Sequence, residues 1–278
     1  MNNFVKRTLT ATVFVAVLLG CTIWNQYSFS VLFFVITILG VWEFYTLSEK
    51  GGSNPQKIVG TIIGALLFAG NALVCMHTEN GTNFLDPRFL VIIIPVIFLI
   101  FIIELYSKAA DPFRNIAFTL MGIFYVALPF SLLNYIATAT ANYNYQLLFG
   151  FFFILWCNDS GAYLVGSAIG KHKLFLRVSP GKTWEGSIGG AIASYGVAYL
   201  ISGWYTSISR IDWMVIATIL IVIGTLGDLV KSIFKRSLNV KDSGTILPGH
   251  GGILDRFDSL IMSAPFVFTY LYLAKLFC

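Results

Sequence analysis

The chain has little charge, little histidine and little cysteine. Only 11% of its 278 residues are Asp, Glu, Lys or Arg, whereas soluble domains carry about 25%. It has three histidines and four cysteines, and no two cysteines have the CxxC spacing. The cysteines lie mostly within apolar runs, at Cys21, Cys75, Cys157 and Cys278. These absences exclude a soluble globular domain and argue against a disulfide framework or a structural zinc site.

What the chain has instead is apolar sequence. Hydrophobic residues make up 57% of it, and its mean hydropathy is +0.79. A helix needs about 20 apolar residues to cross the hydrocarbon core of a bilayer. We therefore expect an all-α polytopic membrane protein with about nine transmembrane helices, eight and ten being open alternatives. The expected spans are residues 8–24, 28–48, 58–76, 88–106, 116–136, 147–169, 186–203, 212–230 and 260–277.

The basic residues predict the orientation. With a cytoplasmic N-terminus, all but three of the 18 lysines and arginines fall on the cytoplasmic side, the exceptions being Arg88, Arg210 and Lys275. This imbalance follows the positive-inside rule, and nine spans place the C-terminus outside. It also argues against nucleic acid as the partner of a chain with net charge +5. A lipoprotein signal ending at Cys21 is disfavoured, because Leu19 is bulky where a small residue is usual.

No fixed-period repeat or low-complexity linker divides the sequence. We expect one membrane domain over 1–278, with N-terminal helices in 1–136 and catalytic helices and cytoplasmic loops in 147–278. Glu43 and Glu104 lie near the cytoplasmic ends of the second and fourth spans. They are expected to snorkel or to pair with basic loop residues, and lining a cavity is the alternative. Close helix packing is favoured by three small-residue pairs: Gly60 and Gly64, Gly166 and Gly170, Gly186 and Gly190.

Polar and glycine residues gather in one string between Ser232 and Asp258. It reads Ser232-Ile-Phe-Lys235-Arg236, then Lys241-Asp242-Ser-Gly244, then Leu247-Pro248-Gly-His250-Gly251-Gly252-Ile-Leu-Asp255-Arg256-Phe-Asp258. Ionisable residues among apolar spans are costly and are kept where they do chemistry. Lysine and arginine bind phosphates, carboxylates bind divalent metals, and glycine lets backbone approach a ligand. The string predicts a phosphoryl-handling site at a membrane surface.

This string is similar, position by position, to the signature of the phosphatidate cytidylyltransferases, also called CDP-diacylglycerol synthases. Asp159-Ser-Gly-Ala162-Tyr163 and Ser179-Pro-Gly-Lys182-Thr183-Trp-Glu185-Gly186 resemble the same family. The resemblance covers roughly residues 150–278. It implies that CTP and phosphatidate are the substrates, and that CDP-diacylglycerol for phospholipid biosynthesis and pyrophosphate are the products.

The metal is expected to be Mg²⁺. Asp228 lies on one helical face with Lys231, Ser232 and Lys235, which suits a metal–phosphate edge. Mg²⁺ is usually held by one or two carboxylates, with water and substrate phosphates completing its coordination. We predict Asp228 and Asp255 as its ligands, and the resemblance supports that pair. Helix capping by Asp255 is the alternative.

The remaining site residues follow from charge and from the resemblance. Lys182 and the hydroxyl groups near it are expected to contact the triphosphate, although Leu176 stands where a Walker P-loop needs glycine and no β-strand is expected before this stretch. His250 donates to a phosphate, orders its loop, or acts as a base; the base role is disfavoured because a phosphate monoester is already ionised. The predicted catalytic residues are Asp228, Asp255, Lys182, Lys235 and Arg236. The predicted substrate-binding residues are Ser179, Thr183, Asp159, Ser232, Lys241, Asp242, His250, Gly251, Gly252, Arg256 and Asp258.

Two other functions stay open. One is a CTP-dependent lipid kinase or another lipid-phosphate cytidylyltransferase. The other is a transporter, which the clustering of charges on one membrane face disfavours, since transporter sites lie near the midplane. We expect the bacterial inner (plasma) membrane, with the site facing the cytoplasm and membrane lipid around the protein. A homodimer is an open alternative to a monomer.

Overall fold

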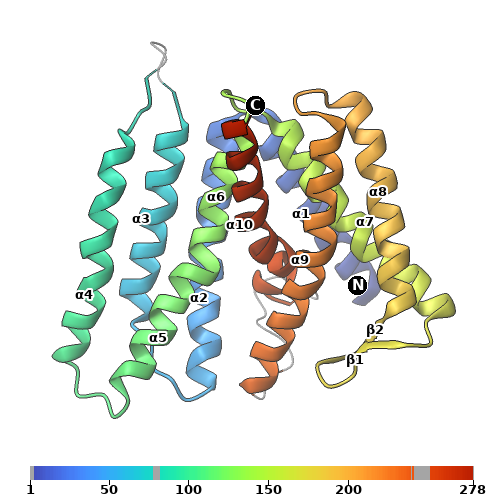
Figure 1. The fold of residues 1–278 in the computed structure, drawn as a ribbon. Coiled ribbons are helices and arrows are strands. Elements are labelled where there is room, and N and C mark those ends of the chain that lie inside the picture. Colours follow the sequence, from blue (N-terminus) through green and yellow to red (C-terminus); the bar gives the residue numbers. More distant parts are fainter. Residues whose placement is uncertain (1–2, 78–81, 239, 241–250, 278) are drawn as a thin grey trace. The chain divides into compact units, whose positions relative to one another are not determined.

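The computed structural model describes residues 3–77, 82–238, 240 and 251–277, and it is almost entirely helical (Figure 1). The elements are α1 (Asn3–Trp24), α2 (Gln26–Lys50), α3 (Lys57–Cys75), η1 (Pro87–Ile92), α4 (Ile93–Leu105), α5 (Pro112–Gly122), η2 (Ile123–Ala127), α6 (Leu128–Ala137), α7 (Tyr145–Ile169), β1 (Lys173–Phe175), β2 (Ser179–Thr183), α8 (Trp184–Trp204), α9 (Arg210–Ser237) and α10 (Leu254–Phe277). They belong to two compact units. The first comprises residues 1–135 and 237–257, and the second comprises residues 136–236 and 258–278.

Seven helices among the described residues are long and apolar enough to cross a membrane. They are α2, α3, η1 with α4, α5 with η2 and α6, α7, α9, and α10 as far as Ala274. The protein is therefore an all-α polytopic membrane protein, as its composition predicts. Two expected spans are not among these seven: in α1 the apolar helix that the structure describes covers Leu9–Trp24, and α8 is less apolar. The count of nine and the orientation of the termini stay predictions.

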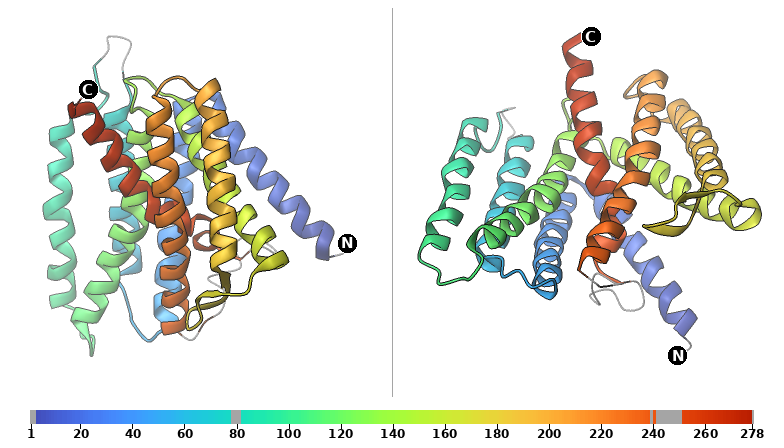
Figure 2. Two further views of the ribbon diagram at one scale, coloured as in Figure 1. Left: turned by 45° about the vertical axis from the view of Figure 1, so that its right-hand side comes forward. Right: turned by 60° about the horizontal axis from the view of Figure 1, so that its bottom comes forward.

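α8 is less apolar because glycine, serine and tyrosine interrupt its hydrophobic residues. The glycines let it lie directly against α7, and the two helices run side by side in the views of the second unit (Figure 2). A Cβ on Gly161 would lie 3.1 Å from the Cα of Gly190, and one on Gly166 would lie 3.4 Å from the Cα of Gly186. The close packing predicted for Gly166 and Gly186 is confirmed.

A short hairpin departs from the all-helical expectation. β1 and β2 pair antiparallel between α7 and α8, with Lys173 opposite Thr183 and Phe175 opposite Ser179. A strand therefore does precede Lys182, contrary to the sequence prediction. The hairpin is closed at its base by a hydrogen bond from the backbone N–H of Trp184 to the carbonyl of His172 (2.9 Å).

In the first unit, the buried Glu104 differs from its prediction. Its carboxylate accepts hydrogen bonds from the side-chain amides of Gln56 (2.7 Å) and Asn115 (3.0 Å). It is 4% exposed, so it does not snorkel, and these partners are neutral amides, not basic loop residues. Buried polar groups need such partners, and here Gln56, just before α3, and Asn115, within α5, supply them.

Glu43 differs in a similar way. Its carboxylate is buried in the first unit and accepts hydrogen bonds from the backbone N–H groups of Ile253 and Leu254, where α10 begins. It was predicted to snorkel or to pair with a basic loop residue. The first turn of a helix has N–H groups without partners inside the helix, and these attract the carboxylate instead.

Candidate functional site

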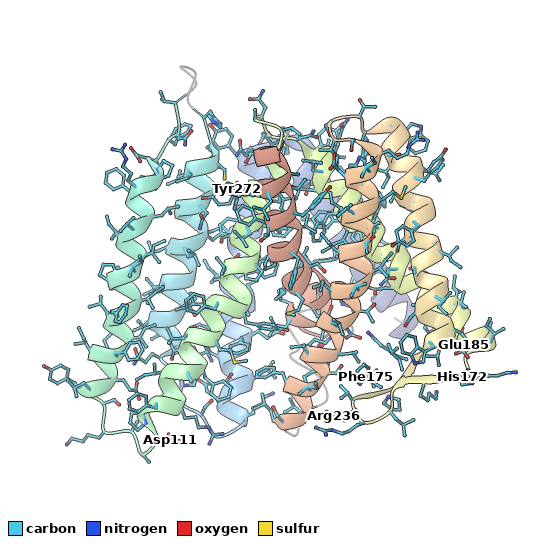
Figure 3. The ribbon with its side chains drawn as sticks, viewed as in Figure 1. Asp111, His172, Phe175, Glu185, Arg236 and Tyr272 are labelled. Carbon is cyan, nitrogen blue, oxygen red and sulfur yellow. The ribbon has the colours of Figure 1, made fainter. Side chains whose placement is uncertain are left out.

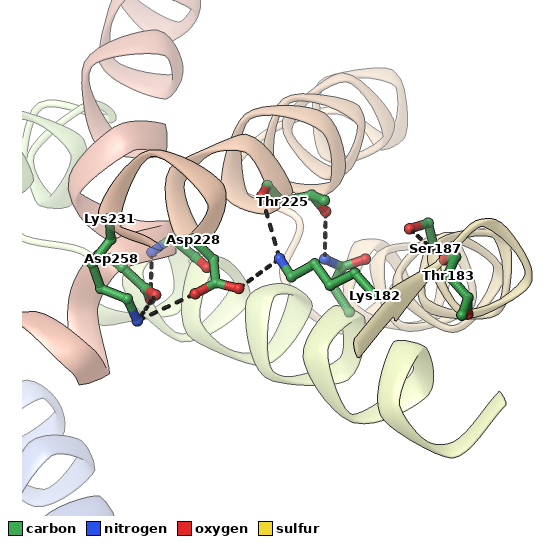
Figure 4. A network of polar contacts seen from close by, with 9 residues as sticks. Lys182, Thr183, Ser187, Thr225, Asp228, Lys231 and Asp258 are labelled. Atoms are coloured by element: carbon green, nitrogen blue, oxygen red, sulfur yellow. Dashed lines mark hydrogen bonds and ion pairs between the residues drawn. The ribbon is translucent and has the colours of Figure 1, made fainter. Parts of the chain in front are cut away.

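A chain of alternating charges joins β2, α9 and α10 in the second unit (Figure 4). The Nζ of Lys182 lies 2.6 Å from Oδ2 of Asp228, and the Nζ of Lys231 lies 3.2 Å from Oδ1 of the same aspartate. The Nζ of Lys231 also lies 2.5 Å from Oδ2 of Asp258. Each carboxylate therefore contacts at least one ammonium group, and Lys231 connects the two aspartates.

Helix geometry and small residues bring these groups together. Asp228 and Lys231 are three residues apart on α9, so their side chains lie on one face. At Gly227, a Cβ would lie 2.8 Å from both the carbonyl oxygen of Asp258 and the Cβ of Met262. Because Gly227 has no side chain, α10 packs directly on α9, and Lys231 can reach Asp258.

The start of α8 positions Lys182. Lys182 is followed by Thr183, whose hydroxyl oxygen accepts the N–H of Gly186 (3.1 Å) and so caps α8. The cap fixes the end of β2, and the Lys182 side chain then extends to α9. There its ammonium group also donates to the carbonyl of Thr225 (3.4 Å).

Among the contacts that the structure describes, carboxylates outnumber ammonium groups in this network. Asp159 on α7 is exposed and interacts electrostatically with Lys182, Asp228 and Lys231. Within these described contacts, three carboxylates face two ammonium groups. Lys231 and Asp258 are each only 9% exposed, and a buried charge is tolerated only when it is paired. The excess negative charge suits a bound cation.

The oxygen donors here fit Mg²⁺, which prefers carboxylate oxygens together with water and phosphate. Asp228 and Asp258 both lie in the second unit and both contact Lys231. Asp255 belongs to the first unit, so the Asp228–Asp255 pair stays a prediction. Among the described residues, no group of three or more His, Cys, Asp and Glu side chains that could hold a metal ion is found.

Beside the β1–β2 hairpin, Glu185 in the first turn of α8 binds His172, the residue before β1 (Figure 3). Oε1 of Glu185 lies 2.5 Å from Nδ1 of His172, and the carboxylate accepts the backbone N–H groups of Lys171 and His172 at 3.1 to 3.2 Å. Hydrogen bonds from its own backbone N–H, from the His172 ring and from those two backbone groups lower the pKa of Glu185 from 4.5 to about 2. Glu185 therefore holds the hairpin to α8 as an anion.

Glu185→Gln is expected to lower the thermal stability of the second unit at neutral pH. Because folding depresses this pKa, the stabilisation is present above the unfolded value of 4.5 and is lost as pH falls through about 2. The difference in Tm between the variant and the unaltered protein should therefore shrink across that window. A difference that does not change between neutral pH and pH below the folded pKa would show that the Glu185 anion is not the source.

The other predicted site residues lie in three places. Ser179 begins β2, and Ser232, Lys235 and Arg236 lie in the last turns of α9, with Arg236 exposed at the same end of the second unit as the hairpin (Figure 3). In the first unit lie Gly251, Gly252, Asp255 and Arg256, at the start of α10. Lys241, Asp242 and His250 lie outside the described residues. Thr183 has a capping role, and the substrate roles predicted for all of these residues stay predictions.

Lys231 is the residue whose importance the sequence prediction did not recognise. Its spacing places it on the same helical face as Asp228, but the predicted catalytic and binding residues do not include it. The signal was present in its spacing from Asp228. Its second partner, Asp258, depends on the packing of α10 against α9, which the spacing does not reveal.

The fold and this network define an integral membrane protein with buried, paired charges of the kind that handles phosphate groups. A family model described as the cytidylyltransferase family matches residues 5–274, and the chain belongs to that family.

Three relatives each bear the name phosphatidate cytidylyltransferase. The protein from Staphylococcus saprophyticus is 38% identical over 224 residues, which cover 80% of this chain and 84% of the relative. The protein from Haemophilus influenzae is 31% identical over 283 residues, covering 96% and 98%. The protein from Staphylococcus aureus strain COL is 34% identical over 261 residues, covering 93% and 95%. The similarity thus includes the N-terminal helices, which the sequence motifs alone do not reach.

Proposed function

We propose that this protein transfers the cytidylyl group of CTP to phosphatidate. A phosphate oxygen of phosphatidate attacks the α-phosphorus of CTP, and the bond from that phosphorus to the bridging oxygen of the β-phosphate breaks. The products are CDP-diacylglycerol and pyrophosphate. Membership of the cytidylyltransferase family and the shared name of its relatives support this reaction. The Lys182–Asp228–Lys231–Asp258 network is the structural observation that carries it.

The reaction brings two polyanions together, so its main demands are charge neutralisation and orientation. Lys182 is half-buried beside Asp228, where it is held ready to bind the triphosphate. Lys231 is fixed between two carboxylates, which keep its ammonium group in place. The attacking phosphate monoester is ionised at neutral pH, so the site needs no activated serine or cysteine.

Mg²⁺, when bound, would neutralise phosphate charge and orient the triphosphate. Asp228 and Asp255 are its predicted ligands, and Asp258 supplies a further carboxylate beside Asp228. Asp228 then has two tasks, since its oxygens also orient Lys182 and Lys231.

The proposed setting is the inner (plasma) membrane of a bacterium, with the site facing the cytoplasm, where CTP is present. The distribution of basic residues supports this orientation. The acyl chains of phosphatidate would stay in the bilayer while the headgroup enters between helices. A homodimer stays a prediction.

The direct test is turnover by the purified protein in detergent. We expect lipid-extractable cytidine label only when CTP, phosphatidate and Mg²⁺ are all present. Diacylglycerol offered in place of phosphatidate should give no product, because it lacks the attacking phosphate. Product from diacylglycerol, or none from phosphatidate, would contradict the proposal.

A further inference from the structure

Glu43 is a buried carboxylate in α2 of the first unit, 3% exposed. A carboxylate in such surroundings is costly unless its oxygens accept good hydrogen bonds. Oε2 of Glu43 accepts the backbone N–H of Ile253 at 2.7 Å, and Oε1 accepts the backbone N–H of Leu254 at 3.2 Å. The side chain thus binds the backbone at the beginning of α10.

This arrangement is a helix cap supplied from far away in the sequence. The first N–H groups of a helix have no partners within it, and a negative charge there is favoured by the helix dipole. Such a cap usually comes from the residue just before the helix. Here it comes from a residue 210 positions earlier than Ile253, so α2 and the first turn of α10 are held together.

The two glycines before α10 fit this contact. Gly252 is buried, and a Cβ at that position would overlap the carboxylate of Glu43. Gly251 has φ +84°, a conformation that favours glycine, and a Cβ there would lie 2.8 Å from Oδ2 of Asp255. The backbone therefore passes close to two carboxylates, and a side chain at Gly252 would displace Glu43.

We propose that Glu43 is a positioning residue for the reaction: it fixes residues 252–254 and thereby orients Asp255, which follows them in the first turn of α10. Glu43 acts through the backbone and touches no substrate. The inference rests on the proposed function, because it assigns Glu43 a role in presenting a predicted Mg²⁺ ligand. The hydrogen bonds of such supporting groups commonly decide how well a ligand is oriented.

Glu43→Gln tests the contact, with Glu104→Gln as the matched control. Glutamine keeps the size of the side chain, but it loses the charge and turns an NH₂ group toward one of the two N–H donors. Glu104 is equally buried in the same unit, but its partners are the side-chain amides of Gln56 and Asn115. Each variant thus removes one buried negative charge, but only Glu43→Gln removes it from the start of α10.

The first readout is hydrogen exchange of the peptide spanning residues 251–258, measured by mass spectrometry in detergent without substrate. Loss of a cap is expected to speed exchange there by about fivefold in Glu43→Gln and to leave Glu104→Gln unchanged. Equal exchange in Glu43→Gln and the unaltered protein would overturn the contact. This readout does not depend on turnover, so it separates a failure of the contact from a failure of the proposed function.

The second readout is the Mg²⁺ concentration that gives half-maximal activity. We expect it to rise about ten- to a hundredfold in Glu43→Gln, the usual effect of removing a group that orients a metal ligand, and to stay unchanged in Glu104→Gln. Faster exchange without this rise would overturn the positioning role and leave only a helix cap. A general loss of folding would instead lower the amount of active enzyme without changing its Mg²⁺ dependence.

If Glu43→Gln does not fold, a second pair of variants tests the contact between Glu43 and the backbone at Gly252. Gly252→Ala should be severely destabilised, and adding Glu43→Asp should recover part of the loss, because the shorter side chain makes room for the new methyl group. Contacting residues show such non-additive effects, whereas distant ones do not. Additive losses of thermal stability in the double variant would overturn the contact.

Discussion

Asp228→Asn is expected to abolish turnover while the protein stays folded and inserted in the membrane. The amide is a poor Mg²⁺ ligand, and it also removes the negative partner that Lys182 and Lys231 share, at 2.6 and 3.2 Å. The substitution removes both a predicted metal ligand and the anionic partner of two lysines. We therefore expect it to have the largest effect on turnover. The measurement is kcat at saturating Mg²⁺, with helix content and gel filtration as checks of folding.

Asp212→Asn is the matched control on the same helix. Asp212 lies at the opposite end of α9, where it accepts hydrogen bonds from Ser209 and from Tyr270 of α10. Asp212→Asn should lower the stability of the protein but leave kcat nearly unchanged.

Asp255→Asn should be inactive, as Asp228→Asn is. Activity above about a tenth of the unaltered level, a loss of less than about 1.4 kcal/mol, would contradict the metal role of either residue.

Lys182→Ala is expected to lower kcat/KM for CTP by about ten- to a hundredfold. Lys182 is predicted to bind phosphate charge, and a charge-assisted hydrogen bond contributes about 1.5–3 kcal/mol, which corresponds to about one to two decades in rate or affinity. Its removal also leaves one oxygen of Asp228 without its ammonium partner. Initial rates over a range of CTP concentrations measure the effect.

Lys173→Ala is the control for charge on the same hairpin. Lys173 is exposed and lies opposite Thr183 in the β1–β2 pairing, one residue from the position of Lys182. If general attraction of anions to the hairpin were the cause, kcat/KM for CTP would fall equally in both variants.

His250→Gln should keep measurable activity, because glutamine still donates a hydrogen bond. An inactive His250→Gln beside a nearly normal Lys182→Ala would identify the histidine as the catalytic group.

Local spacing was enough to predict several of these features. Apolar runs of the right length predicted the membrane helices, and the glycines of α7 and α8 predicted their close packing. The three-residue spacing of Asp228 and Lys231 placed them on one face. Each of these features depends on the sequence of a single helix or on the small size of glycine. Each can therefore be predicted without knowing which helices pack together.

The partners of the buried charges were not predictable in the same way. Lys231 binds Asp258 because Gly227 lets α10 approach α9, and Glu43 binds Ile253 from a helix 210 residues away in the sequence. Such pairs depend on which helices pack together. The β1–β2 hairpin was also missed, because its Gly/Pro-rich strand lacks the alternation that marks a strand.

The position of the transferred phosphorus tests the proposed reaction most directly. The purified protein is given phosphatidate, Mg²⁺ and CTP carrying ³²P at either the α- or the γ-phosphate. Cytidylyl transfer predicts that the α-label enters the lipid and that the γ-label leaves as pyrophosphate. Entry of the γ-label into the lipid would identify a CTP-dependent lipid kinase and would contradict the account.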